Sequence, residues 1–183
     1  MIASSPSSEI RALGGEDAEA FSSLRRVLTA DNPVPMGLSL EEELTRPLEG
    51  FRAQLTSPAP NAVFGAFVNG QLAATAAVSR ASSFASSGHK MVMWGVFTRP
   101  DLRRRGLGKA VVRRAIAHAV TSGVRRINLL VYVPNDPALA LYRSLGFQEC
   151  GTEPEAICLE GRFHDGVHMS LMAGSRPTAA ALG

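Results

Sequence analysis

Apolar residues in the first third of the chain recur at helical spacing. In residues 14–33 an apolar face follows acidic residues in the first turn and ends before a proline, a pattern that predicts an amphipathic helix. A second helical pattern covers residues 39–58, where Ser39 and Glu42 have the spacing of a capping box. Pro47 lies in the middle of this pattern, so we expect the helix to kink there or to divide in two.

The apolar pattern then changes to the period of two that strands show. Residues 62–80 form two apolar runs around Asn69 and Gly70, a pair typical of a type I′ hairpin turn. Residues 90–98 are apolar on both faces, which predicts a central strand covered on both sides. Gly95 within this run indicates a bulge.

The second half of the chain predicts a helix, a strand, a short helix and a hairpin, over residues 107–122, 125–133, 137–145 and 147–172. Asp136 has the position of an N-cap for the short helix, and Gly146 follows its last turn. The succession of strand, helix and strand implies one parallel crossover. The whole order predicts an α/β fold in which helices flank a mixed, mostly antiparallel central sheet.

Length and composition fit one domain. The chain has 183 residues, of which 45% are apolar, enough for one hydrophobic core. We expect a single domain over residues 9–173, with flexible tails at 1–8 and 174–183 because these ends are small, polar and contain proline. No apolar run approaches the roughly 18 to 20 residues of a membrane span, and the N-terminus lacks a signal-peptide pattern, so we expect a cytoplasmic protein without membrane contact.

The cysteines and histidines predict no metal site. Cys150 and Cys158 are too few for a disulfide framework or a zinc site, and we expect them to be reduced thiols. His118 and the arginines at 113–114 and 125–126 are expected on solvated faces and are assigned no function.

A cluster of arginines leads into two glycines at the start of the helix at 107–122. Arg103 to Arg105 precede Gly106 and Gly108. A helix N-terminus presents unpaired N–H groups, and glycines let an anion approach the backbone, so this segment predicts a diphosphate site. It matches neither a P-loop nor the dinucleotide fingerprint, which needs a third glycine where Val111 stands. The alternative is a solvated basic helix start.

A second motif follows the first at the distance of one helix and one strand. The first motif is Arg103-x-x-Gly106-x-Gly108, and the second comprises Asn135, Ala138, Tyr142, Gly146 and Phe147. Together they resemble the pyrophosphate loop and the Asn-x-x-Ala-x-x-x-Tyr-x-x-x-Gly-Phe segment of the GNAT superfamily of acetyl-CoA-dependent N-acetyltransferases. The resemblance covers residues 91–147 by motif and most of the chain by order of elements. It implies a GNAT-like sheet with one parallel, splayed strand pair at the cofactor site.

The resemblance also implies that acetyl-CoA is the acetyl donor, and it assigns residues to it. The strand positions whose backbone pairs with the pantetheine arm are Val96, Phe97 and Thr98. The residues of the diphosphate loop are Arg103, Arg104, Arg105, Gly106, Leu107, Gly108 and Lys109. Asn135 matches a residue near the cofactor arm, although an Asn before Asp-Pro also suits a turn. Tyr142 matches the general acid beside the cofactor, since a phenol of pKa about 10 can protonate the departing thiolate.

The acceptor side is less defined. Many members of the family keep a Glu on the central strand as a base, but residues 90–98 contain no carboxylate. The candidates for a water-relayed base are Glu41, Glu42, Glu43, Glu153, His164 and His168, and water alone is the alternative. We expect direct attack by a primary amine in a ternary complex, because neither cysteine has a visible base partner that would make it a nucleophile.

The acceptor is expected to be a small-molecule or peptide amine whose identity the sequence leaves open. One competing hypothesis is a catalytically idle acyl-CoA-binding module, which an intact Tyr142 argues against. Another is a basic nucleic-acid-binding protein. The net charge of +3 favours an anionic partner only weakly, and an aromatic content of 6%, mostly in predicted core strands, argues against this hypothesis. We therefore expect no nucleic-acid partner. A homodimer through a C-terminal strand edge is left open.

Overall fold

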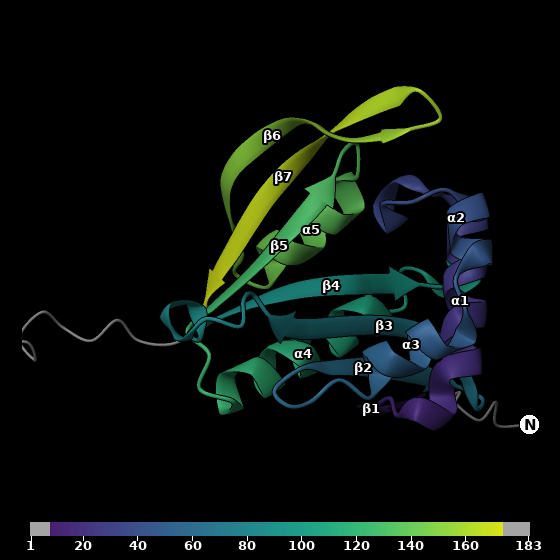
Figure 1. Ribbon diagram of the computed structural model, residues 1–183, viewed down its shortest axis with the longest axis horizontal. Helices are drawn as coiled ribbons and strands as arrows, with labels where there is room; N and C mark the ends of the chain where they lie inside the picture. Colours follow the sequence, from purple (N-terminus) through teal and green to yellow (C-terminus); the bar gives the residue numbers. More distant parts are fainter. Residues whose placement is uncertain (1–7, 174–183) are drawn as a thin grey trace, which may run out of the picture.

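Seven strands form one sheet within residues 8–173, the part of the chain that the computed structural model describes. They are β1 (Ser8–Ala12), β2 (Ala62–Val68), β3 (Gln71–Arg80), β4 (Lys90–Thr98), β5 (Arg126–Tyr132), β6 (Gln148–Leu159) and β7 (Arg162–Met172). Their order across the sheet is β1-β2-β3-β4-β5-β7-β6, and β4 and β5 are the one parallel pair among these strands (Figure 1). The prediction of a mixed, mostly antiparallel sheet is confirmed.

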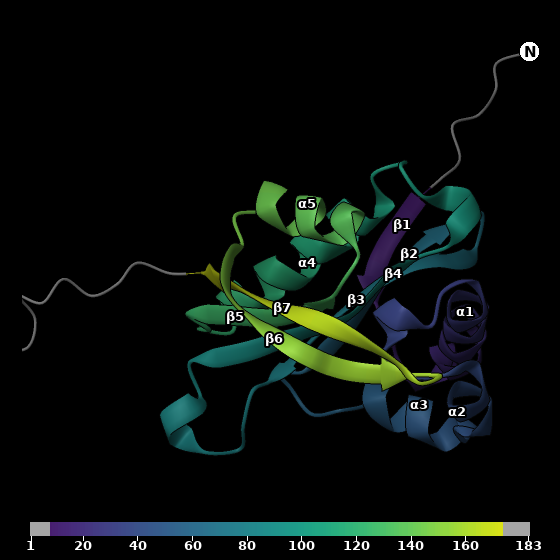
Figure 2. The ribbon, with the colours of Figure 1, turned by 90° about the horizontal axis from the view of Figure 1, so that it is seen from above.

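Helices cover both faces of the sheet. They are α1 (Ala18–Asp31), α2 (Leu40–Thr45), α3 (Leu48–Leu55), α4 (Leu107–Thr121) and α5 (Asp136–Ser144), with single 3-10 turns that include η2 (Val34–Met36). Figure 2 shows α4 and α5 on one side of the sheet and α1, α2 and α3 on the other. Pro47 separates α2 from α3, so the predicted second helix is divided in two.

Each face of the sheet has its own apolar cluster. Beneath α4 and α5 the buried residues include Phe64, Met91 and Ile127, all less than 2% exposed. Beneath α1 and α3 they include Phe21 and Phe51, whose rings pack edge to face with centroids 6.1 Å apart. Each such side chain contributes about 1.5–3 kcal/mol when fully buried. Among the described residues, the second cluster draws on β2, β3 and β4 and takes no residue from β5, β7 or β6.

Strand β5 therefore has one covered and one less covered face. Ile127, Leu129 and Val131 are buried against the α4–α5 side, while the alternate residues from Arg126 to Tyr132 are half-buried on the opposite face. We call that opposite face of β5, β7 and β6 the open face.

Local signals in the sequence are confirmed at two places. Asn69 and Gly70 have φ values of 51° and 75°, as a type I′ turn requires, and they join β2 to β3. The Ser39 hydroxyl accepts a hydrogen bond from the Glu42 N–H at 3.1 Å, and the Glu42 carboxylate accepts one from the Ser39 N–H at 2.7 Å. These two bonds form the predicted capping box of α2.

Two boundary predictions are corrected. Ser8, assigned to an N-terminal tail, is the first residue of β1 and pairs with Val68 of β2. The N-cap of α5 is Asn135 instead of Asp136, which is the first residue of that helix. The predicted tail segments 1–7 and 174–183 lie outside the described residues. Within residues 8–173, no helix has the length and apolar character needed to cross a membrane.

Candidate active site

Strands β4 and β5 pair at one end and separate at the other. Their parallel pairing covers Lys90–Val92 with Arg126–Asn128, and beyond it the two strands diverge (Figure 1). A small cavity of about 80 Å³ lies where they diverge. It is lined by β4 from Met93 to Phe97, by β5 from Leu129 to Tyr132, and by residues of α5 and η2. The predicted splayed pair is thus present.

A bulge bends β4 at the level of this cavity. The register with β3 shifts where Thr75 and Ala77 face Phe97 and Trp94, and Gly95 has a φ of 60°. The Thr75 hydroxyl donates a hydrogen bond to the Gly95 carbonyl oxygen at 2.8 Å. The bulge predicted at Gly95 is confirmed, and it leaves the following residues of β4 with a free backbone edge toward the cavity.

Tyr142 of α5 lines the same cavity from the side of the sheet that α4 and α5 cover. The side chain is 7% exposed, and its ring packs edge to face on Phe147 with centroids 5.5 Å apart. Burial raises the pKa of the Tyr142 phenol above its ordinary value, so the hydroxyl stays protonated at neutral pH. Within residues 8–173 this hydroxyl makes no hydrogen bond, which leaves its proton available to a group in the cavity.

The glycine loop leads directly into α4. Arg104 and Gly106 have φ values of 63° and 80°, and α4 begins at Leu107 without a side-chain cap on its first N–H groups. A Cβ at Gly106 would meet no atom within 4 Å, whereas one at Gly108 would lie 3.0 Å from the Thr98 hydroxyl. The first turn of α4 is therefore open to solvent at Gly106 and packs closely on the end of β4. This geometry fits an anion held by backbone N–H groups.

The three loop arginines have different surroundings. Arg103 donates to the Asp31 carboxylate at 2.7 Å and to the Thr98 carbonyl oxygen at 3.3 Å, so its side chain ties the loop to α1 and β4. Arg104 and Arg105 are exposed. Lys109 in the first turn of α4 is half-buried.

Asn135 has a structural role that sequence reasoning did not assign. Its side-chain oxygen accepts a hydrogen bond from the Ala138 N–H at 3.3 Å and so caps α5. Asn135 also lines the cavity beside Tyr142, so the cap holds α5 in place where the two strands diverge.

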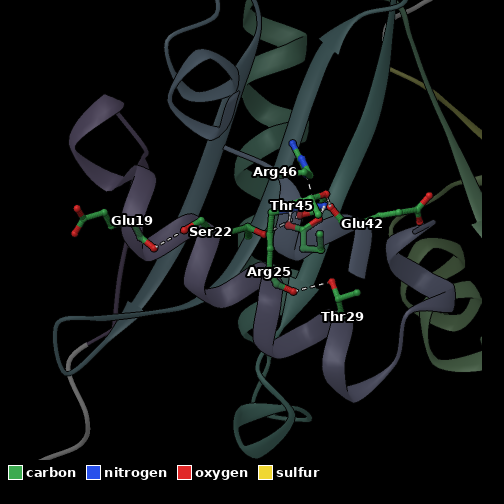
Figure 3. Close-up of polar contacts among 10 residues, drawn as sticks. Glu19, Ser22, Arg25, Thr29, Glu42, Thr45 and Arg46 are labelled. Carbon is green, nitrogen blue, oxygen red and sulfur yellow. Dashed lines mark hydrogen bonds and ion pairs between the residues drawn. The ribbon is translucent and has the colours of Figure 1, made fainter. Parts of the chain in front are cut away.

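The candidate base Glu43 is buried in an ion-pair cluster. Arg25 donates to both of its carboxylate oxygens at 2.7 and 2.9 Å, and Arg46 donates at 3.2 Å (Figure 3). Glu43 is fully buried. Burial alone raises the pKa of the Glu43 carboxyl, but the two guanidinium groups outweigh it and hold the pKa below its usual value. Glu43 is therefore a fixed anion that joins α1 to α2, and Glu42 is engaged in the capping box.

Two other candidates meet on the open face. The His168 Nε2 lies 2.8 Å from the Glu153 carboxylate, and both line a pocket of about 670 Å³. His168 is the register partner of Leu130, which lines the smaller cavity. Glu41 and His164 line neither of these two cavities. Among residues 8–173 no cluster of His, Cys, Asp and Glu could hold a metal ion.

Two predictions about solvated side chains are wrong. His118 Nε2 lies 2.8 Å from the Pro60 carbonyl oxygen, and its ring packs against Phe64. Arg126 is part-buried and hydrogen-bonded to Asn128 and Ser170. The partners are distant along the chain in three of these four contacts, and no local sequence signal could have found those three.

The family model described as Acetyltransferase (GNAT) family matches residues 22–147. This chain belongs to that family. A Streptococcus pneumoniae GNAT acetyltransferase has the same fold, with a TM-score of 0.82 over 91% of this chain and 99% of its own, at 23% identity. A Salmonella typhimurium acetyltransferase solved with its cofactor acetyl-CoA has a TM-score of 0.77 over 93% and 96% of the two chains, at 19% identity. At such identities these likenesses show the fold alone.

Curated relatives match this GNAT member over a short segment. An uncharacterized N-acetyltransferase of Methanocaldococcus jannaschii is 43% identical over 54 residues, which are 30% of this chain and 24% of the relative. The ribosomal protein bS18-alanine N-acetyltransferase of Escherichia coli is 39% identical over 57 residues, 31% of this chain and 38% of the relative. A Corynebacterium efficiens mycothiol acetyltransferase is 47% identical over 45 residues, 25% and 15% of the two chains. The match thus spans well under half of each relative.

Proposed function

We propose that this GNAT member is an acetyl-CoA-dependent N-acetyltransferase, acting through residues 8–173 as one domain and transferring the acetyl group to a primary amine by direct attack in a ternary complex. The observation that carries the proposal is the cavity at the splay of β4 and β5, with the buried Tyr142 hydroxyl lining it and the uncapped first turn of α4 at the end of β4. Acetyl-CoA supplies a thioester whose acyl carbon accepts the amine and whose sulfur leaves as a thiolate.

Different residues of the chain bind different parts of acetyl-CoA. The free edge of β4 at Val96, Phe97 and Thr98 offers backbone groups to the amides of an extended pantetheine arm. The N–H groups after Gly106 face the diphosphate, and Arg104 and Arg105 add positive charge at the surface. Asn135 fixes the end of α5 at the cavity.

Tyr142 is the general acid of the proposed reaction. As the nitrogen–carbon bond forms and the carbon–sulfur bond breaks, its hydroxyl donates a proton to the departing sulfur. The raised pKa keeps that proton on the phenol at neutral pH, so the hydroxyl is present as a donor when the sulfur departs. An ammonium group must lose one proton before it attacks, and solvent on the open face can receive it. The nitrogen loses a second proton after the nitrogen–carbon bond forms, and this proton restores the Tyr142 phenol by way of solvent.

The test is a panel of amines incubated with acetyl-CoA, with release of free thiol as the readout. Primary amines of several classes are included, and omission of the amine gives the background rate. We expect at least one amine to raise thiol release well above that background. Binding of CoA without thiol release from any amine would instead favour the idle acyl-CoA-binding module. Absence of CoA binding, together with tight nucleic-acid binding that resists salt, would favour the nucleic-acid hypothesis.

A further inference from the structure

Two cations lie side by side at the border between β4 and the open face. Lys90 of β4 and Arg126 of β5 are register partners in the parallel pair, so their side chains project from the same face of the sheet. Both are half-buried. Within residues 8–173 neither forms an ion pair with a carboxylate, although like charges at neighbouring positions repel.

The guanidinium of Arg126 is held in place by neutral groups. Its Nε donates to the Asn128 side-chain oxygen at 3.0 Å and to the Ser170 hydroxyl at 2.8 Å, and one terminal nitrogen lies 3.9 Å from the Cys150 sulfur. Because the oxygens engage Nε, the outer edge with the two terminal nitrogens is left for another acceptor. That edge has the fork geometry that binds a carboxylate through two hydrogen bonds.

Arg126 lines the larger pocket of about 670 Å³. The pair of His168 and Glu153 lines it as well. His168 and Ser170 are two residues apart on β7 and point to the same face, a spacing of about 7 Å. The pocket and the cavity that holds Tyr142 share Leu129 as a lining residue.

We propose that this pocket binds the carboxylate of the acceptor, so that the substrates are amines that also carry a carboxylate. Arg126 determines this specificity, and Lys90 adds to the positive potential. The amine must reach past His168 to the splay while the carboxylate stays at Arg126, so the two groups are separated by at least about 7 Å, the span of two extended residues. A short peptide with a free C-terminus has this form. The inference rests on the proposed function, because it names the acceptor for that reaction.

The test compares diglycine with diglycinamide, which differ only in the carboxylate. Affinity is measured by calorimetry in the presence of CoA, and KM is measured wherever turnover occurs. We expect the wild type to favour diglycine by tenfold or more. Arg126→Met should remove most of that preference by weakening diglycine and leaving diglycinamide unchanged. Arg126→Lys should retain part of it, and Arg113→Met, on the exposed side of α4, should retain all of it.

Equal affinity of the wild type for the two peptides would overturn the inference, as would an unchanged preference in Arg126→Met. If that variant does not fold, the wild-type preference and its partial loss in Lys90→Met decide the question. Binding that depends on the carboxylate and on Arg126, without thiol release from any amine, would support this pocket and contradict the proposed function. Thiol release with equal KM values for both peptides would support the function and contradict the pocket.

Discussion

Arg25 and Arg126 lie on the two halves of the sheet and have opposite surroundings. Arg25 of α1 is 5% exposed, pairs with both oxygens of Glu43, and lies with its guanidinium carbon 5.6 Å from the centre of the Phe97 ring. Arg126 of β5 is only part-buried and has neutral partners. The first arginine lies where helices cover β2, β3 and β4, and the second lies on the open face.

The difference follows from the cost of taking a charge out of water. A buried charge without a partner costs several kcal/mol, so Arg25 and Glu43 must be present together or not at all. A part-buried arginine keeps some hydration and tolerates the lack of an anion until a ligand supplies one. The charged pair beneath the helices therefore holds α1 and α2 together, whereas Arg126 on the open face is left for the ligand that we propose.

The largest expected effect is on turnover and concerns Tyr142, which lines the cavity where β4 and β5 diverge. Tyr142→Phe removes one hydroxyl and keeps the ring that packs on Phe147. We expect turnover with the best amine to fall by a factor of about 10² to 10⁴, with a much smaller change in CoA affinity. The melting temperature should change little, because the hydroxyl makes no hydrogen bond within the described residues. Steady-state kinetics and thermal unfolding on the same variant check both statements.

The chain contains a natural comparison for that variant. Its other tyrosine, Tyr132, lines the same cavity from the open face and packs near Gly37. Tyr132→Phe should reduce turnover by less than tenfold. Wild-type turnover in Tyr142→Phe would end its assignment as the general acid.

The second effect is on stability and lies in the covered half. Glu43→Gln leaves Arg25 buried without its anion, so we expect the free energy of unfolding to fall by about 3–5 kcal/mol. Glu41→Gln, an exposed position on the same short helix, should change it by less than about 0.5 kcal/mol. Denaturant unfolding of both variants measures the difference. Equal stability of the two variants would show that the cluster does not hold α1 to α2.

A third, smaller effect concerns the diphosphate loop. Gly106→Val places a β-branched residue at a φ of 80°, which strains the loop before α4, and we expect CoA affinity to fall by about tenfold, or 1.4 kcal/mol. Gly123→Val is the matched control, since Gly123 has a φ of 78° beyond the other end of α4 and likewise has open space around it. It should lose stability but keep CoA affinity in calorimetry. Equal CoA affinity in the two variants would contradict the anion site.

The smallest effect is a pH dependence of stability. The pKa of Tyr142 is raised in the folded state by burial, so above the unfolded value of about 10 the unfolded chain binds fewer protons than the folded one. Stability from this group is complete below that pH and declines above it. The wild type should lose more stability than Tyr142→Phe between pH 9 and about pH 11 in denaturant titrations. Parallel curves for the two proteins would contradict the burial of a neutral phenol.

The elements that sequence reasoning predicted correctly depend on residues close together along the chain. The type I′ turn needs only Asn69 and Gly70, and the capping box needs only Ser39 and Glu42. The N-cap of α5 was placed one residue late because Asn135 and Asp136 are both good capping residues, and pattern alone does not choose between them.

The surroundings of charged side chains were the part that sequence could not supply. Arg103 pairs with Asp31, 72 residues away, and His118 contacts the Pro60 carbonyl across 58 residues. The sequence alone makes Glu43 one of six candidate bases, whereas the structure shows that it is buried between Arg25 and Arg46. The motifs therefore predicted a diphosphate loop and a role for Tyr142, whereas the pocket at Arg126 depends on strands that pair only in three dimensions.

The separation of β4 from β5 also bears on self-association of the protein. An unpaired strand edge at the border of a sheet is a template on which another chain can add a strand, and such edges promote aggregation. From Met93 to Thr98 β4 has an unpaired edge of about 20 Å, but this edge faces inward and is closed at one end by its pairing with β5. A second polypeptide strand, with side chains on both faces, does not fit there. We expect only a narrow chain carrying a few amide groups to pair with it, so that β4 keeps an unpaired backbone edge without promoting self-association.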